Sequence, residues 1–182
     1  MSQNENVKTP RIRLRALNLS DADTLYAWEN SPEARDSAGT QHPLSAEFIR
    51  SYITESATSL TTKGELALMA ELSDTALPIG YLQLLAYEPI SRRMSVGLYI
   101  SPEYRRQGYG RELMMLVQSY AFRRLGLRML YAKVLASNVP SCALFESLGY
   151  SHTATLPDWQ WVDGEYHDLR YYQLCSNPQP SA

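Results

Sequence analysis

Three arginines and two glycines gather in one short stretch, which reads Arg105-Arg106-Gln107-Gly108-Tyr109-Gly110-Arg111. A short apolar run over 96–100 precedes it, and an amphipathic helical pattern over 110–125 follows it. A turn between a strand and a helix presents backbone N–H groups at the positive end of the helix, where an anion binds well. Glycine lets a ligand approach the backbone closely, and guanidinium groups add positive charge. The stretch therefore predicts a phosphate or pyrophosphate site.

Three kinds of phosphate loop carry glycines at comparable spacing. A P-loop requires a Gly-Lys-Ser/Thr ending, which the chain lacks. A dinucleotide fingerprint requires a third glycine where Leu113 stands and an acid about twenty residues later, where 130–134 offers no carboxylate. Residues 105–110 instead resemble, position by position, the pyrophosphate loop of the GCN5-related N-acetyltransferases, Gln/Arg-x-x-Gly-x-Gly/Ala. A glycine turn that only begins a helix is the structural alternative.

A second segment supports this resemblance. Residues 138–150 resemble the family's other signature, Asn-x-x-Ala/Ser-x-x-Leu-Tyr/Phe-x-x-x-Gly-Phe/Tyr. Asn138 can cap a helix, Pro140 suits the first turn, and Gly149 suits a left-handed stop after the helix. Because both motifs occur in the family's order, about 30 residues apart, they favour the family over a lone glycine turn.

Length and composition limit the class of protein. The 182 residues, 45% hydrophobic and 20% charged, predict one soluble domain over 1–182, with a core over about 11–175 and polar tails at 1–10 and 176–182. The resemblance implies that it is a single N-acetyltransferase domain. No apolar stretch is long enough for a membrane span, and the net charge of −2 argues against general nucleic-acid binding. Cys142 and Cys175 are expected to be reduced thiols in a cytoplasmic protein. The sequence does not decide whether the protein forms a homo-oligomer.

The hydrophobic pattern predicts the order β-α-α-β-β-β-α-β-α-β-β. Strands are expected at 11–17, 66–72, 78–87, 96–100, 129–135, 150–162 and 166–174. One helix is expected from a capping box at 20–23 up to Pro32, and a second after Pro43 with Ser45 as its cap. Two further helices are expected at 110–125 and 141–148. This order resembles the family's α/β fold, a mixed, mostly antiparallel sheet with splayed strands and helices on both faces.

The resemblance implies acetyl-CoA as cosubstrate and no metal. It implies that pantetheine pairs with the strand backbone in the splayed gap, and that the acetyl group points to a cleft between the first two helices and the last hairpin. The residues expected to bind the cosubstrate are Leu98, Tyr99, Ile100, Arg105, Arg106, Gln107, Gly108, Tyr109, Gly110, Arg111, Asn138, Ser141 and Phe145.

Acetyl transfer requires a neutral amine, a donor for the developing oxyanion and a proton for the departing thiolate. The backbone N–H near Ile100 can polarise the thioester. Many relatives have a tyrosine as the acid where this chain has Phe145, so Ser141 and, less favoured, Tyr150 are the substitutes. A glutamate common on the strand before the loop is also missing at 95–97. The base is therefore a water or a carboxylate from elsewhere in the chain.

The leading interpretation is transfer of an acetyl group to a primary amine, either of a polyamine-like small molecule or of a protein N-terminus. The segments 14–17, 43–45 and 164–168 resemble the branch of ribosomal-protein and spermidine acetyltransferases. Few acids lie in 39–43, although Glu33 and Asp36 lie upstream, which disfavours a polyamine without excluding it. An acyl-CoA sensor and a nucleotide-binding regulator are the alternatives. Trp159 and Trp161 either line the acceptor pocket or pack together.

Overall fold

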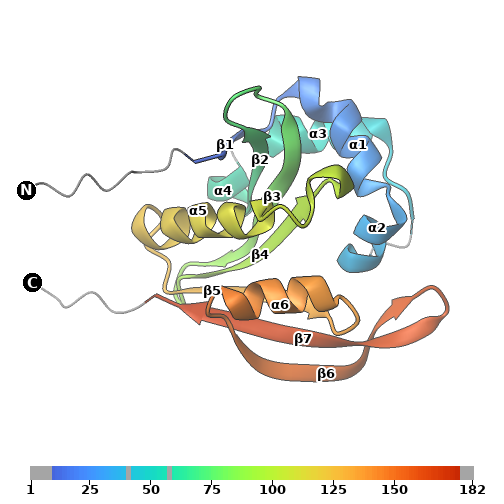
Figure 1. The fold of residues 1–182 in the computed structure, drawn as a ribbon, viewed down its shortest axis with the longest axis vertical. Coiled ribbons are helices and arrows are strands. Elements are labelled where there is room, and N and C mark those ends of the chain that lie inside the picture. Colours follow the sequence, from blue (N-terminus) through green and yellow to red (C-terminus); the bar gives the residue numbers. More distant parts are fainter. Residues whose placement is uncertain (1–9, 40–41, 57–58, 177–182) are drawn as a thin grey trace, which may run out of the picture.

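The computed structural model describes residues 10–39, 42–56 and 59–176. In this part of the chain, seven strands form one sheet in the order β1-β2-β3-β4-β5-β7-β6 (Figure 1). Neighbouring strands are antiparallel except β4 and β5, which confirms the predicted mixed sheet. The strands are β1 Ile12–Ala16, β2 Leu66–Leu72, β3 Pro78–Glu88, β4 Arg93–Ile100, β5 Met129–Leu135, β6 Ser151–Val162 and β7 Glu165–Cys175.

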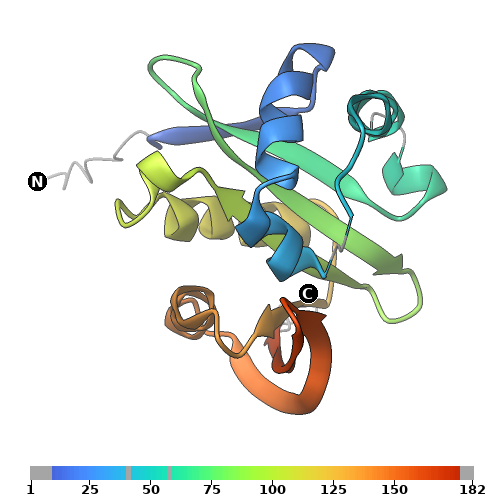
Figure 2. The same cartoon turned by 90° about the vertical axis from the view of Figure 1, so that its right-hand side faces the viewer.

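Helices cover both faces of the sheet, and each face has its own core (Figure 2). Because side chains alternate along a strand, Leu82 of β3 faces α5 and α6 while its neighbour Tyr81 faces α1 and α3. The helices are α1 Ala22–Glu29, α2 Pro32–Ala38, α3 Ala46–Ser56, α4 Ser59–Thr62, α5 Tyr109–Arg123 and α6 Val139–Ser147, with short 3-10 turns η1 Leu19–Asp21 and η2 Pro102–Tyr104.

The segment before α3 differs from its prediction in two ways. The capping box lies two residues earlier than predicted, at 18–21, with the backbone N–H of Asn18 donating to Asp21 Oδ2 at 2.8 Å. The expected helix also ends at Glu29, and a separate α2 begins, because the Ser31 hydroxyl caps a new first turn that contains Pro32. The predicted cap of α3 is confirmed, since the N–H of Phe48 donates to Ser45 Oγ at 3.0 Å.

The sheet opens between β4 and β5. Their parallel register holds only Arg93 opposite Met129, Met94 opposite Leu130, and Ser95 opposite Tyr131. Beyond these pairs, β4 continues to Ile100 along β3, and β5 continues to Leu135 along β7. The two halves of the sheet therefore part, as expected for splayed strands, and one edge of each strand is left without a strand partner.

A buried ion network fixes β1 to its neighbours and thereby positions the start of α1. The Arg15 guanidinium binds Glu71 of β2 at 2.6 Å and Asp21 of η1 at 2.8 Å, and both carboxylates are almost fully buried. Burial alone would raise the pKa of Glu71, but hydrogen bonds from Arg15 and Arg13 outweigh it and lower that pKa below its ordinary value of 4.5. The ion pair therefore stabilises the fold above this value.

We predict that Glu71→Gln lowers the free energy of unfolding by about 3 kcal/mol near neutral pH, because it leaves two guanidinium groups without their buried partner. The pKa of Glu71 is depressed in the fold, so its stabilisation is lost as the pH falls through that depressed value. Urea unfolding should show the gap between wild type and variant closing in acid. The exposed Glu47→Gln is the control, and a pH-independent gap would contradict the ionic account.

Candidate active site

The predicted phosphate turn has the backbone form that an anion site requires. Gly108 caps α5 with a φ of 86°, a left-handed conformation that favours glycine. The first backbone bond of the helix runs from the N–H of Glu112 to the carbonyl of Gly108. No hydrogen bond within the described residues uses the N–H groups of 109–111, as expected for the first turn of a helix. These donors are available to a phosphate.

Arg11, which precedes β1, also lies against this turn, and the sequence analysis did not assign it to the site. Its guanidinium donates to the carbonyl of Gln107 at 3.1 Å and to Glu112 at 2.9 Å, and it covers the ring of Tyr109 at 4.4 Å. A Cβ added to Gly108 would lie 3.3 Å from Arg11 Nη2. The only local signal was alternation with apolar residues, which indicates an edge strand and not a contact 96 residues away.

The arginines of the turn have different surroundings. The side chain of Arg105 turns to α2, where it binds Glu33 at 2.7 Å, and it also donates to the carbonyl of Ile100 at 2.7 Å. Arg111 reaches α6 and donates to the carbonyl and hydroxyl of Ser147. Within the described residues, Arg106 alone of the three has no hydrogen bond or ion pair, so its guanidinium is the one available to a ligand.

The open edge of β4 supplies backbone donors to the gap. The N–H of Ser101 donates to the carbonyl of Ile79 on the β3 side. Because successive backbone groups of a strand point to opposite edges, the N–H groups of Leu98 and Ile100 point into the gap and that of Tyr99 toward β3. Of the expected backbone partners, Leu98 and Ile100 thus have the required orientation, and Tyr99 contributes its side chain instead.

The second motif meets the first across the gap. Asn138 Oδ1 accepts from the N–H of Ser141 at 3.2 Å, so the predicted cap forms, and Gly149 ends the segment with a φ of 85°. Leu144 of α6 comes within 3.6 Å of the place that a Cβ of Gly110 would take, and Leu98 within 3.8 Å. The start of α5, the open half of β4 and α6 therefore form one apolar junction.

The two candidate acids lie in different environments. Tyr150 is only 3% exposed, packs edge-on against Phe145, and its buried hydroxyl has no hydrogen-bond partner within the described residues. Burial raises the pKa of Tyr150 well above its ordinary value. Because the Tyr150 hydroxyl is enclosed in the core, Ser141 stays the favoured of the two candidate acids. Ser141 is half-buried, and its hydroxyl has no hydrogen bond in the described part of the chain.

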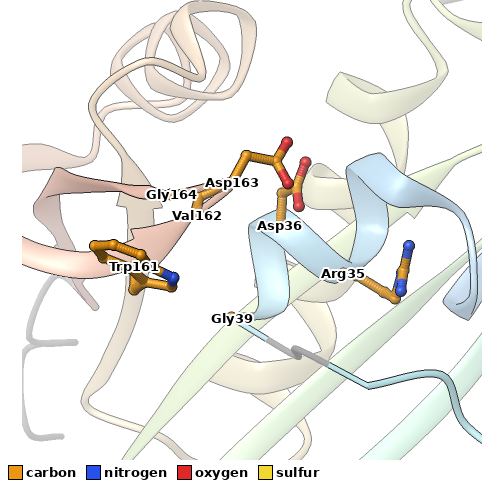
Figure 3. A pocket seen from close by; sticks show the side chains of 7 residues that line it. All are labelled: Arg35, Asp36, Gly39, Trp161, Val162, Asp163 and Gly164. Atoms are coloured by element: carbon orange, nitrogen blue, oxygen red, sulfur yellow. The ribbon is translucent and has the colours of Figure 1, made fainter.

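A cleft of about 270 Å³ lies between α2 and the β6–β7 hairpin. Figure 3 shows the carboxylates of Asp36 and Asp163 turned toward one another across it, while Arg35 turns away. Trp161 lines the cleft from β6, whereas Trp159 is 61% exposed and does not line it. Gln160 ties the two walls together, because its Nε2 donates to the carbonyl of Asp36 at 2.6 Å.

His167 and Asp168 lie in β7, and neither lines this cleft. The Asp168 carboxylate accepts from the N–H of Asp158 at 3.1 Å, which is a structural role within the hairpin. Among the described residues, no group of histidine, cysteine, aspartate and glutamate side chains could hold a metal ion. None of the helices described is both long and apolar enough to cross a membrane.

Comparison with known proteins defines the class to which this fold and site belong. A match to the Acetyltransferase (GNAT) domain covers residues 11–151. The chain is 28% identical over 168 residues to the uncharacterized N-acetyltransferase YoaA of Bacillus subtilis, covering 92% of this chain and 95% of that protein. It is 29% identical to the spermidine N(1)-acetyltransferase of Vibrio cholerae, over 54% of this chain and 57% of that enzyme.

A solved structure shares the fold. The spermidine N-acetyltransferase of Vibrio cholerae, in complex with CoA and spermine, superposes with a TM-score of 0.83 at 21% identity, covering 91% of this chain and 95% of that one. The class is that of the N-acetyltransferases. The chain belongs to the GNAT acetyltransferase family, and the non-catalytic sensor is not favoured.

We predict that Gly108→Val weakens CoA binding at least tenfold, since a branched side chain would fill the approach to the N–H groups of α5. Gly126→Val is the matched control. Gly126 also has a left-handed φ, 64°, so both variants carry about 1–2 kcal/mol of backbone strain, but a side chain at 126 enters open space after α5. Calorimetry with CoA checks this prediction. An equal affinity for CoA in the two variants would contradict the assignment of the turn 105–111 to the CoA site.

Asn138 allows a second, independent test. Asn138→Asp keeps the oxygen that caps α6 but loses the amide N–H donor, whereas Asn138→Ala loses both. If the amide contacts pantetheine, both substitutions should lower kcat/KM for acetyl-CoA, by an amount that corresponds to about 1–2 kcal/mol of transition-state binding. Only the alanine variant should also lose about 1 kcal/mol of folding stability, because it loses the helix cap. Steady-state kinetics with thermal unfolding separates the two effects. An aspartate variant with wild-type kcat/KM would make Asn138 a helix cap alone.

Proposed function

We propose that the protein transfers the acetyl group of acetyl-CoA to a primary amine of a small, multiply charged polyamine-like acceptor. The observation that carries the proposal is the pair of carboxylates of Asp36 and Asp163, which face each other in the cleft between α2 and the hairpin (Figure 3). Two anionic groups on one cleft favour a ligand with separated positive charges. Trp161 adds an aromatic wall on which a cation or a methylene chain can pack.

The position of the cleft supports the same assignment. Its α2 wall is tied to the end of β4 through Glu33 and Arg105, and its hairpin wall continues from β7, the neighbour of β5. The cleft thus lies where the two splayed halves of the sheet face each other. In the proposed arrangement the pyrophosphate lies at the turn 105–111, pantetheine runs along Leu98 and Ile100, and the thioester ends near the cleft.

The chain's own groups then have separate roles. The N–H of Ile100 polarises the thioester carbonyl. One oriented donor in this role contributes about 3–4 kcal/mol to transition-state binding. The half-buried hydroxyl of Ser141 is the candidate donor to the leaving thiolate. Because a thiol has an ordinary pKa near 8.5, its thiolate leaves readily and this donor contributes modestly. Asn138 orients the amide chain of pantetheine.

The acceptor assignment predicts that Asp36→Asn and Asp163→Asn each raise KM for spermidine about tenfold, with kcat little changed. Each substitution removes a charge attraction that is equally strong in the bound substrate and in the transition state. Glu165→Gln is the matched control, since Glu165 lies on the same hairpin without lining the cleft. Thiol release from acetyl-CoA would be followed with spermidine, spermine, amino sugars and N-terminal peptides. Acetylation of peptides but of no polyamine would assign the protein-N-terminus alternative instead.

A further inference from the structure

A hollow lies on the face of β4 that is opposite α5. Gly97 is opposite Gln83, and the next residue on this face, Tyr99, is opposite Tyr81. A Cβ added to Gly97 would meet no atom within 4 Å, so the absent side chain leaves open space over the strand. Gly97 also belongs to the half of β4 that has parted from β5. The hollow therefore borders the gap in which the thioester is proposed to end.

The walls of the hollow are polar and aromatic. The rings of Tyr81 and Tyr99 stack at 5.6 Å, and Trp28 of α1 packs on both, at 6.2 Å and 5.4 Å. On the other side, Gln83 donates to the hydroxyl of Tyr52 at 2.9 Å. Aromatic faces with nearby hydroxyl groups suit an ammonium group, which is attracted by the ring face and donates hydrogen bonds.

One carboxylate reaches this wall. Glu29 is the last residue of α1, and its carboxylate lies close enough to the hydroxyl of Tyr81 for each group to shift the pKa of the other. Unlike Glu33, Glu71 and Asp21, it forms no ion pair within the described residues. Residues 93–100 of β4 themselves contain no carboxylate. Glu29 is therefore an acid held by an aromatic wall and lacking the arginine that neutralises each of the other three.

Burial raises the pKa of Glu29 above its ordinary value of 4.5, although the nearby hydroxyl of Tyr81 opposes this. The other charged and titratable groups around it are Tyr81 and Tyr99 from the sheet, Tyr52 from α3, Glu65 near Tyr52, and the ion pair of Glu33 with Arg105 beside Tyr99. The one cation named among these is already bound to Glu33 at 2.7 Å. A carboxylate that is partly desolvated and not neutralised is a stronger base than one in water.

We propose that Glu29, with Tyr81, binds the reacting ammonium of the acceptor over Gly97 and takes its proton. The proposal rests on the amine acetylation proposed above and adds the base to it. An N–H bond of the ammonium breaks, its electron pair stays on nitrogen, and the proton goes to a Glu29 oxygen. The free amine then forms the bond to the acetyl carbon while the carbon–sulfur bond breaks, with its electrons on sulfur. Glu29 afterwards releases its proton to solvent.

The two acidic parts of the acceptor site then differ in purpose. Asp36 and Asp163 face an open cleft and hold the distant charge of a polyamine-like molecule. Glu29 lies at the end of α1 near Tyr81 of β3, which is paired with Tyr99 of the parted strand, and acts on the nitrogen that reacts.

The decisive variant is Glu29→Gln, which keeps the shape of the side chain and a polar oxygen but removes the charge and the basicity. We expect kcat for spermidine to fall about 100-fold near pH 7, within the range of general base catalysis. The deficit should shrink as the pH approaches the amine pKa, about 10.4, because free amine then needs no base. Tyr81→Phe should show a smaller loss with the same pH trend. Asp23→Asn, an exposed change on α1, is the control.

Stability provides a readout that a structural role would move in the opposite direction. Since the pKa of Glu29 is raised in the fold, its charged form costs stability above the ordinary value of 4.5, and this cost is absent in the glutamine variant. Glu29→Gln should therefore unfold at the same temperature as wild type or higher near pH 7, and should bind CoA normally. A variant with a lower unfolding temperature and a loss of kcat that is equal at every pH would make Glu29 a structural residue and overturn the proposal.

Calorimetry with spermidine in the presence of CoA completes the test without turnover. Glu29→Gln should weaken this binding about tenfold, whereas Asp23→Asn should not. Wild-type spermidine affinity and wild-type kcat in Glu29→Gln would overturn the base assignment while leaving amine acetylation in place. A wild-type protein that acetylates no amine would overturn the function itself, and unchanged binding in Glu29→Gln would then reject the Glu29 site separately.

Discussion

The parting of β4 from β5 after three residue pairs is the constraint on which the rest of the molecule depends. Backbone N–H and C=O groups away from bulk water need partners, and a strand edge that ends its pairing in mid-sheet leaves a row of them open. β4 then runs for a further five residues with β3 alone. The phosphate turn, the cap of α6 and the acceptor cleft all lie around this interruption, so the ligand gap follows from the topology of the sheet.

Strands were the most predictable elements, because apolar runs bounded by turn residues are local signals. β2 and β5 have the predicted bounds, and the turn of the last hairpin is at Asp163-Gly164 as expected. Two short helices, α2 and α4, were missed, and α2 had a local signal in Ser31-Pro32, a cap followed by a residue suited to a first turn. Proline was taken as the end of a helix when it was the beginning of another.

The site was predictable where its chemistry is carried by consecutive residues. Gly108, Gly110 and Asn138 have the conformations and caps that their motifs indicate. Arg11 and Glu29 could not be assigned, because each comes to the site from a distant element through packing that no local pattern reports. The burial of the Tyr150 hydroxyl could not be predicted for the related reason that a motif gives a position along the chain but not how deeply a side chain is buried.

The hydrogen bond from Gln160 to the carbonyl of Asp36 has a consequence for how two substrates share the enzyme. It joins the two walls of the cleft proposed for the acceptor, one on α2 and one on the β6–β7 hairpin, so we expect a change in the width of the gap to change the spacing of Asp36 and Asp163. Occupancy by the acyl donor and affinity for the amine are then thermodynamically linked, and the linkage is reciprocal. An analogue of the acyl donor that is too short to fill the gap would therefore leave the carboxylates of Asp36 and Asp163 at a different spacing when the amine binds.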